Sequence, residues 1–327
     1  MRWIRNRGTA MNEPVISVKD LSVAFGGRTG AQVTDRVSFD IFRGEFFALV
    51  GESGCGKSVT AMSLLRLLPV PSARIVSGSV IFGGKNLLEL PLNEMRKVRG
   101  AEISCIFQEP MQALDPVIPV GKQLYEALRG KPAAEVEERT RGLLKLAGFP
   151  DPDRILRAYP HELSGGMLQR ACIVMALLPS PALIIADEPT TALDVTVQAQ
   201  VLEVLKKLAR DTGTAVLLIT HNMGLVAQYA QRVSVMYAGR IVESGPAEAV
   251  IAHPMHPYTK ALLSAIPDGR SDLHALRSIP GNVPAPADFA AGCRFKDRCP
   301  CASEECAAFP PRQGTDGHFT MCFNPAE

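Results

Sequence analysis

Eight residues at positions 51–58, Gly-Glu-Ser-Gly-Cys-Gly-Lys-Ser, have the types and the spacing needed to bind phosphate groups. Glycines let the backbone approach an anion closely, and the amides at a helix N-terminus meet it with a favourable dipole. Lys57 adds a positive charge for the β- and γ-phosphates, and Ser58 offers a hydroxyl to Mg²⁺, which prefers hard oxygen ligands. The residues that we assign to nucleotide binding here are Gly51, Glu52, Ser53, Gly54, Cys55, Gly56, Lys57, Ser58 and Val59.

The elements that must position this loop are visible in the apolar runs around it. The loop follows the apolar run 46–50 and leads into a stretch, 58–68, whose composition suits a helix. A buried strand that turns directly into a helix is the setting that such a loop requires. Two later apolar runs, 183–186 and 215–220, are also typical of strands covered on both faces. The sequence therefore predicts an α/β core built on a parallel sheet.

Segments of different character flank and interrupt this core. Residues 15–25 and 33–42 have β-branched content and partial alternation, which predicts an antiparallel subdomain. Between about 88 and 178 the strand signals fade, and we expect an inserted helical subdomain with helices at 120–128, 133–147 and 165–178. After residue 253 the composition shifts to proline, glycine and cysteine. We expect three parts: a disordered start at 1–13, a core domain at 14–252 and a C-terminal extension at 253–327.

Composition limits the classes of function. The chain has 327 residues, of which 46% are hydrophobic and 21% charged, so it can form more than one core. Its 35 basic residues balance 33 acidic ones, and the net charge of +2 gives no reason to expect nucleic acid as a partner. Prolines at 179 and 181 interrupt the longest apolar stretch, so we expect no membrane-spanning helix. The first ten residues lack the apolar segment of a secretory signal, and Met11 is an alternative start.

A second glycine-rich segment, Leu-Ser-Gly-Gly-Met-Leu-Gln-Arg at 163–170, narrows the function. Ser164, Gly165 and Gly166 begin a second helix whose N-terminus can bind an anion, and one nucleotide does not need two such sites from one subunit. At this point the sequence resembles the ABC (ATP-binding cassette) ATPase family. The resemblance implies that these three residues, with Gln169, cap the γ-phosphate of ATP held by an opposite subunit. The alternative is that the segment is only a helix cap.

The resemblance assigns roles to further residues that occur in the family's order. Asp187 resembles the carboxylate that supports Mg²⁺, and the adjacent Glu188 resembles the residue that polarises the attacking water. His221 resembles the switch histidine that contacts the γ-phosphate, although a lone histidine can also be structural. Phosphoryl transfer depends chiefly on positioning and charge stabilisation, so these residues and Lys57 form a sufficient catalytic set.

Three more residues match family positions. Gln108 resembles the glutamine that reaches Mg²⁺ and the attacking water while its loop touches a membrane partner, and the alternative is an ordinary surface loop. Asp194 matches a loop that bridges the two active sites across the dimer. Phe25 stands where the family places an aromatic ring against adenine, and the alternative is a core phenylalanine at a strand end.

Five of the eight cysteines lie in the last 35 residues, four of them at Cys293, Cys299, Cys306 and Cys322, with Cys301 as an additional thiol. An ATPase works in a reducing compartment, where disulfides are rare, so metal or cluster ligation is the favoured interpretation. Four thiolates suit either Zn²⁺ or an iron–sulfur cluster, and the spacing differs from the short pairs of typical zinc sites. Spacing alone leaves both metals open.

The extension carries the finer resemblance. Met-His-Pro-Tyr-Thr at 255–259, followed by Lys-Ala-Leu-Leu-Ser-Ala-Ile-Pro and Gly-Cys-Arg-Phe-Lys-Asp-Arg-Cys-Pro, is similar to the C-terminal extension of ATPase subunits of oligopeptide and dipeptide ABC importers. This resemblance implies a [4Fe-4S] cluster on Cys293, Cys299, Cys306 and Cys322, with Zn²⁺ as the alternative. We expect His256 and Tyr258 to pack the extension against the core.

The resemblance as a whole implies a P-loop (RecA-like) ABC ATPase core of α/β class with an antiparallel β-subdomain, an inserted helical subdomain and a cysteine-rich extension. It implies that ATP and Mg²⁺ drive the import of dipeptides or oligopeptides from the cytoplasmic face of the inner membrane, where the chain is peripheral. The implied partners are a second ATPase subunit, identical or paralogous, two transmembrane permease subunits and an extracytoplasmic solute-binding protein. A nickel or glutathione importer is the nearest alternative, and a soluble non-transport ABC ATPase is a more distant one.

Overall fold

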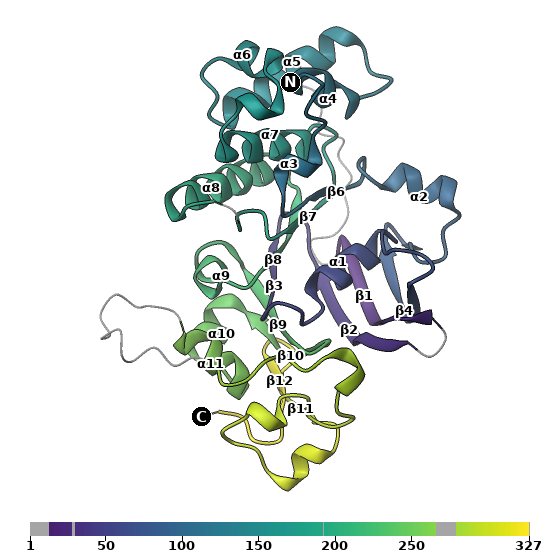
Figure 1. Cartoon of the computed structure of the whole chain (residues 1–327), viewed down its shortest axis with the longest axis vertical. Helices are drawn as coiled ribbons and strands as arrows, with labels where there is room; N and C mark the ends of the chain where they lie inside the picture. The colour runs from purple at the N-terminus through teal and green to yellow at the C-terminus, as the bar shows by residue number, and fades with distance from the viewer. Residues whose placement is uncertain (1–12, 28–29, 192, 266–278, 327) are drawn as a thin grey trace.

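The computed structural model describes residues 13–27, 30–191, 193–265 and 279–326. The expected disordered start therefore lies outside the described residues except for Glu13. Helices gather at one end of the molecule, sheets occupy the middle, and the C-terminal extension (yellow) lies at the opposite end (Figure 1). Within the ranges given, no helix is both long and apolar enough to cross a membrane.

A sheet of eight strands forms the centre, in the order β11-β12-β10-β9-β3-β8-β7-β6. The five strands from β9 to β6 in this order run parallel, as the sequence predicts for the core. β3 and β8 are buried at every residue and keep the predicted limits, whereas β7 is one residue longer than predicted. The parallel strands are β3 (Phe46–Val50), β6 (Ile103–Ile106), β7 (Leu183–Asp187), β8 (Ala215–Thr220) and β9 (Arg232–Tyr237).

An antiparallel sheet in the order β2-β1-β4-β5 packs beside the central sheet. Successive side chains of a strand point to opposite faces, and β7 shows the consequence. Leu183 and Ile185 join the apolar cluster shared with the antiparallel sheet and α1, whereas Ile184 and Ala186 join the cluster under the helices. The elements of this part are β1 (Ile16–Phe25), β2 (Ala31–Ile41), α1 (Lys57–Leu64), β4 (Ala73–Phe82), β5 (Lys85–Asn86) and α2 (Leu92–Val98).

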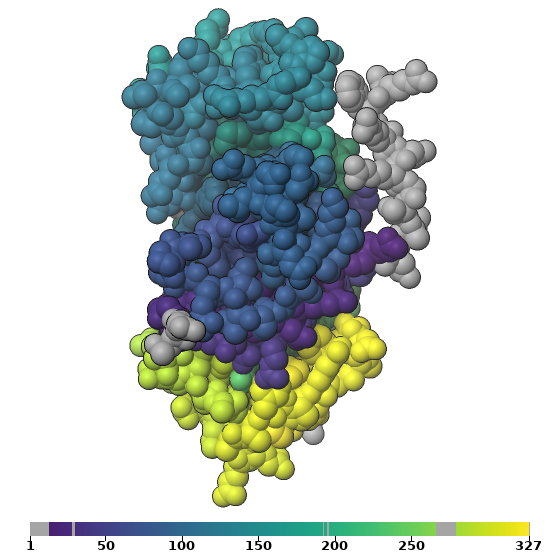
Figure 2. Space-filling view, turned by 90° about the vertical axis from the view of Figure 1, so that its right-hand side faces the viewer, coloured from purple at the N-terminus to yellow at the C-terminus, as the bar shows by residue number. Residues whose placement is uncertain are grey.

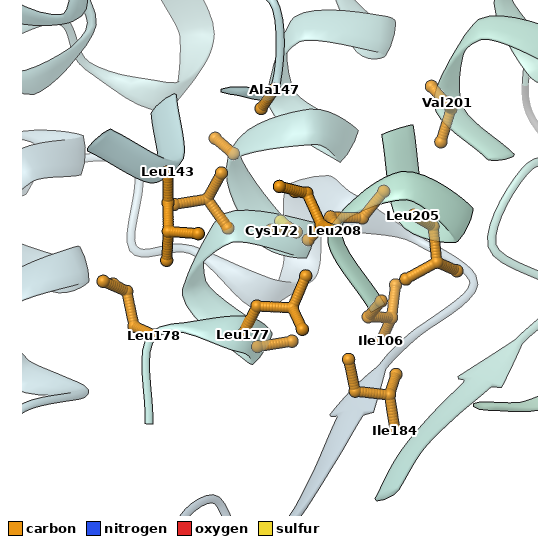
Figure 3. Packing of buried hydrophobic residues seen from close by; sticks show 14 of the residues in the cluster. Ile106, Leu143, Ala147, Cys172, Leu177, Leu178, Ile184, Val201, Leu205 and Leu208 are labelled. Atoms are coloured by element: carbon orange, nitrogen blue, oxygen red, sulfur yellow. The ribbon is translucent and has the colours of Figure 1, made fainter. Parts of the chain in front are cut away.

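The helical part packs on one face of the central sheet through a single apolar cluster. Figure 3 shows side chains of α5, α7 and α8 converging on Ile106 and Ile184 from the sheet. β6 lies inside the segment expected to be helical, and its four residues are too few to give a periodic signal. The helices are α3 (Pro110–Ala113), α4 (Val120–Glu126), α5 (Ala133–Leu146), α6 (Pro152–Arg157), α7 (Gly165–Leu177) and α8 (Val195–Thr212).

This cluster is the first place where we expect a large effect on stability. Leu177 has no exposed surface, so Leu177→Ala leaves a cavity and should lower the free energy of unfolding by about 2–5 kcal/mol, measured by urea denaturation. Leu146, on α5, is 44% exposed. Leu146→Ala is the matched control, and it should change stability by no more than about 0.5 kcal/mol. Equal effects of the two variants would contradict the assigned packing.

The C-terminal extension is joined to the core rather than standing apart from it. β12 pairs with β10 of the central sheet, at Glu243 with Thr320 and Ser244 with Phe319. Figure 2 shows the extension (yellow) lying against the first strands (purple). Its hairpin cannot be seen in the sequence because each strand has only three residues. The last elements of the core are α9 (Met223–Tyr229), β10 (Arg240–Pro246) and α10 (Ala247–Ala252), and those of the extension include α11 (Pro257–Ser264), β11 (Arg312–Gly314) and β12 (Phe319–Met321).

His256 and Tyr258 pack the extension against the core, as expected. They are 1% and 0% exposed, and Tyr258 belongs to the apolar cluster that also contains Tyr237 and Phe295. Nδ1 of His256 accepts a hydrogen bond from the Tyr258 amide at 3.1 Å, a bond that protonation at Nδ1 would break. Burial lowers the pKa of His256 to about 3.

This buried histidine makes stability depend on pH. The pKa of His256 is about 6.5 when unfolded and lower when folded, so the unfolded chain takes up the proton first as pH falls below 6.5. Protonation of this histidine in the unfolded chain should therefore lower the free energy of unfolding by about 2 kcal/mol between pH 7 and pH 5. His256→Asn should flatten this dependence, and the exposed His253→Asn should not. An unchanged slope in His256→Asn would contradict the assignment.

Candidate functional site

The phosphate loop sits where β3 ends and α1 begins. Gly56 caps α1 with φ of 106°, a left-handed conformation that glycine adopts without strain. A Cβ atom on Gly51 would lie 2.1 Å from the carbonyl oxygen of Met236 in β9, so only glycine fits there. The chain therefore reaches the helix by the tight path that exposes loop amides to a bound anion.

Lys57 is held inside this loop. Its Nζ donates to the carbonyl oxygens of Gly51 at 2.7 Å and Glu52 at 2.9 Å, and the residue is 5% exposed. These two carbonyls fix the ammonium beside the loop before any phosphate is present. Cys55 is fully buried, and its Sγ lies 3.8 Å from Nζ of Lys57.

Ser58 and Asp187 form the oxygen pair expected for Mg²⁺. Oγ of Ser58 donates to Oδ1 of Asp187 at 3.0 Å, which joins the start of α1 to the end of β7. Burial raises the pKa of Asp187, and the charge of Glu188 raises it further. A divalent cation would offset this cost of keeping Asp187 ionised, and hydroxyl and carboxylate oxygens are ligands that Mg²⁺ prefers. The donor set therefore fits the metal.

Glu188, predicted to polarise the attacking water, is held by two neighbouring side chains. Its φ of 45° places a non-glycine residue in a sparsely populated conformation, a feature that clusters at active sites. Its carboxylate accepts a hydrogen bond from Thr191 Oγ1 at 2.7 Å and lies 3.3 Å from Nδ1 of His221. Burial raises the pKa of Glu188, but the hydrogen bonds with Thr191 and His221 outweigh it and leave the pKa below its usual value. The side chain is thus ionised at neutral pH.

A cavity of about 210 Å³ brings Lys57, Ser58 and Glu188 together, while Asp187 and His221 lie outside its lining and are joined to Ser58 and Glu188 by hydrogen bonds. Gln108, which lies just after β6, lines the same cavity as the phosphate loop and Glu188. The residues that line it are Val33, Ser53, Gly54, Gly56, Lys57, Ser58, Val59, Gln108 and Glu188. Sequence reasoning did not single out Thr191 or Val33, because a nearby threonine or valine carries no motif.

The second glycine-rich segment lies outside the described lining of this cavity. Ser164 caps α7, and its side chain accepts a hydrogen bond from the Met167 amide at 3.4 Å. Gln169, expected to contact nucleotide, is 1% exposed, and its Nε2 has no hydrogen-bond partner among the described residues. The nucleotide role assigned to Ser164, Gly165, Gly166 and Gln169 stays a prediction about a second subunit.

Asp194 and Phe25 also lie outside the lining of this cavity. Asp194 caps α8 by accepting hydrogen bonds from the amides of Thr196 and Val197 at 3.1 and 3.0 Å. Phe25 ends β1 and packs, partly buried, against the cluster under the antiparallel sheet. Their proposed contacts with a dimer partner and with adenine stay predictions.

The cysteines of the extension do not form a preformed metal centre. In the described part of the chain, no group of three or more histidine, cysteine, aspartate or glutamate side chains is placed to hold a metal ion. Burial raises the pKa of both Cys299 and Cys322 to about 11, so a metal that bound there would have to displace the thiol protons. Cys306 is buried and Cys301 exposed. The site expected on Cys293, Cys299, Cys306 and Cys322 is therefore not confirmed.

Comparisons with solved structures identify the fold. The structure of cbiO1 from Clostridium perfringens superposes with a TM-score of 0.65 at 26% identity, covering 73% of this chain and 91% of that one. The dimeric structure of MJ0796, a bacterial ABC transporter cassette, gives a TM-score of 0.62 at 28% identity, covering 71% and 98%. The fold and the site thus define an ATP-hydrolysing ABC cassette.

Sequence relatives identify the branch of this class. Residues 34–191 match the family described as ABC transporter, and residues 242–306 match the oligopeptide/dipeptide transporter C-terminal region. The chain belongs to the family of ATP-binding proteins of oligopeptide and dipeptide ABC transporters. A probable peptide ABC transporter ATP-binding protein, y4tR of Sinorhizobium fredii, is 48% identical over 320 residues, 96% of each chain. The dipeptide transport ATP-binding protein DppD of Bacillus subtilis is 48% identical over 319 residues, 95% of each chain.

Proposed function

We propose that this ABC ATPase powers the import of dipeptides or oligopeptides. The observation that carries the proposal is the peptide-transporter region at 242–306, joined in one chain to a cavity that gathers the phosphate loop, Gln108 and Glu188. Relatives named for peptide transport align along nearly its whole length.

Within one site the chain's residues divide the work of hydrolysis. Lys57 and the loop amides hold the phosphates, while Ser58, Asp187 and Gln108 would offer oxygen atoms to Mg²⁺, which when bound would neutralise developing phosphate charge. Glu188 orients the attacking water and takes up its proton, and His221 keeps the carboxylate in place. Thr191 fixes the second carboxylate oxygen.

A complete site takes two cassettes arranged head to tail. The helix that begins at Ser164, Gly165 and Gly166 does not line the cavity of its own chain. Its N-terminus favours an anion, and the nucleotide held by an opposite subunit supplies one. ATP binds the closed pair better than the open one, and hydrolysis removes that preference. The second subunit is an identical chain or a paralogue.

The surface that follows Gln108 suits contact with permease subunits. Exposed apolar side chains lie next to Gln108, on α3 and in the loop that follows α3: Phe107 is 45%, Met111 53%, Val117 76% and Ile118 37% exposed. Neighbouring apolar residues on a loop are typical of interaction sites. We place the cassette on the cytoplasmic face of the membrane, bound to two permease subunits that receive solute from an extracytoplasmic binding protein.

Reconstitution tests the proposed cargo. The chain, its co-purifying permease subunits and the solute-binding protein are placed in proteoliposomes, and ATP-dependent uptake of a radiolabelled dipeptide is compared with that of Ni²⁺ and glutathione. We expect uptake of the dipeptide, and no uptake when the ATPase carries Glu188→Gln. Uptake of Ni²⁺ or glutathione without uptake of the dipeptide would contradict the proposed peptide cargo and leave the assignment of ATP hydrolysis intact.

The cysteine site stays a prediction from the resemblance. Proximity supports it, since the amide of Cys293 donates a hydrogen bond to the carbonyl oxygen of Cys306 at 3.0 Å. Metal analysis and the visible absorption of anaerobically purified protein distinguish an iron–sulfur cluster, Zn²⁺ and no metal.

A further inference from the structure

Glu52, in the phosphate loop, is bound by a residue far along the chain. Nη1 of Arg298 donates to its Oε2 at 2.8 Å, and Nη2 donates to its Oε1 at 3.0 Å. This is the two-bond geometry in which arginine and a carboxylate pair most strongly. The Arg298 side chain is only 7% exposed, whereas Glu52 is 28% exposed.

The backbone of the same residue is also engaged at both ends. The amide of Glu52 donates to the hydroxyl of Tyr258 at 2.8 Å, and its carbonyl accepts from Nζ of Lys57 at 2.9 Å. All the polar groups of Glu52 are therefore bound, two of them by the extension and one by the lysine that holds phosphate. A shift of this peptide would move a carbonyl that fixes Lys57.

A rigid aromatic cluster holds the two extension residues in place. The ring of Tyr258 lies 4.8 Å from that of Tyr237 and 5.3 Å from that of Phe295, centroid to centroid. Arg298 also donates to the carbonyl of Pro280 at 2.7 Å, and its guanidinium lies 5.7 Å from the centre of the Tyr237 ring. These contacts fix both donors before nucleotide arrives, so little ordering remains to oppose binding.

We propose that Arg298 and Tyr258 are positioning residues for ATP: acting through Glu52, the extension holds Lys57 and the phosphate loop in the geometry that binds the nucleotide. The physical reason is preorganisation, since a phosphate-binding group placed about 1 Å from its best position loses much of its effect. The inference rests on ATP binding by this chain and not on the identity of the transported solute.

Binding of Mg²⁺ and the non-hydrolysable analogue AMP-PNP to the full chain tests this directly by calorimetry. Arg298→Gln should weaken binding about tenfold, and Tyr258→Phe, which removes one hydroxyl and keeps the ring, by about threefold to tenfold. Arg298→Lys should fall between wild type and Arg298→Gln, because an ammonium supplies charge without the paired geometry. Combining Glu52→Gln with Arg298→Gln should add little to Arg298→Gln alone, since the pair is already broken.

The control is Arg312→Gln, a change at a half-exposed arginine of the same extension that pairs with Asp316. It should alter the affinity by less than about twofold. A merely structural role for Arg298 would lower the melting temperature and the fraction of protein that binds, while the affinity of the binding-competent fraction stayed at the wild-type value. That pattern, or wild-type affinity in folded Tyr258→Phe, would overturn the proposal.

Discussion

Replacing Glu188 by glutamine should lower steady-state ATP turnover of the assembled transporter by about 10²- to 10⁴-fold and leave ATP binding almost unchanged. The amide keeps the size of the side chain and can still accept a hydrogen bond from Thr191, but it cannot take up a proton from water. Phosphate release measures turnover, and calorimetry with Mg²⁺ and AMP-PNP measures binding. Loss of turnover without loss of binding is the signature of a residue that acts in the transition state.

A surface pair supplies the matched control for this variant. Glu94 and Lys97 form an exposed ion pair on α2, with a distance of 2.7 Å between Oε1 and Nζ. Glu94→Gln makes the same chemical change away from the cavity and should leave turnover at the wild-type value. Turnover near wild type in Glu188→Gln as well would show that another group activates the water.

Replacing Lys57 by methionine should weaken nucleotide binding by roughly 10²-fold or more. The reason is the loss of charge-assisted hydrogen bonds to phosphate, each of which contributes about 1.5–3 kcal/mol. Methionine has a similar length and is apolar, so the nearly buried position can still be filled and the protein should fold. Calorimetry with Mg²⁺ and AMP-PNP checks the affinity, and the melting temperature without nucleotide checks the fold.

Lys97→Met, the other half of the control pair, should bind AMP-PNP as the wild type does. If Lys57→Met bound equally well, the loop amides alone would carry the affinity, and the ammonium would have no part in binding. Turnover in Lys57→Met should fall with binding, in contrast to Glu188→Gln, because the lysine contacts phosphate before and during the reaction.

The parts of the fold that the sequence predicted correctly depend on neighbours along the chain. The strand at 46–50 follows from a short apolar run. The turn into α1 follows from glycines, because the backbone there takes a path that other residues do not fit. The strand at 215–220 is apolar throughout for the same reason: both faces are covered. The structure places Lys57, Gln108 and Glu188 in one cavity, and the roles assigned to them from these motifs stay predictions.

Other features depend on contacts between distant residues, and no local pattern contains them. β6 is too short to show a period, and the three-residue strands of the extension gain stability only by pairing with one another and with β10. The bond between Arg298 and Glu52 joins positions 246 residues apart. The sequence by itself determined the nucleotide chemistry, because backbone conformation and periodicity are local. Only the tertiary structure decided that Arg298 and Tyr258 of the extension hydrogen-bond to Glu52 in the phosphate loop, because burial and ion pairing require both partners to be in place.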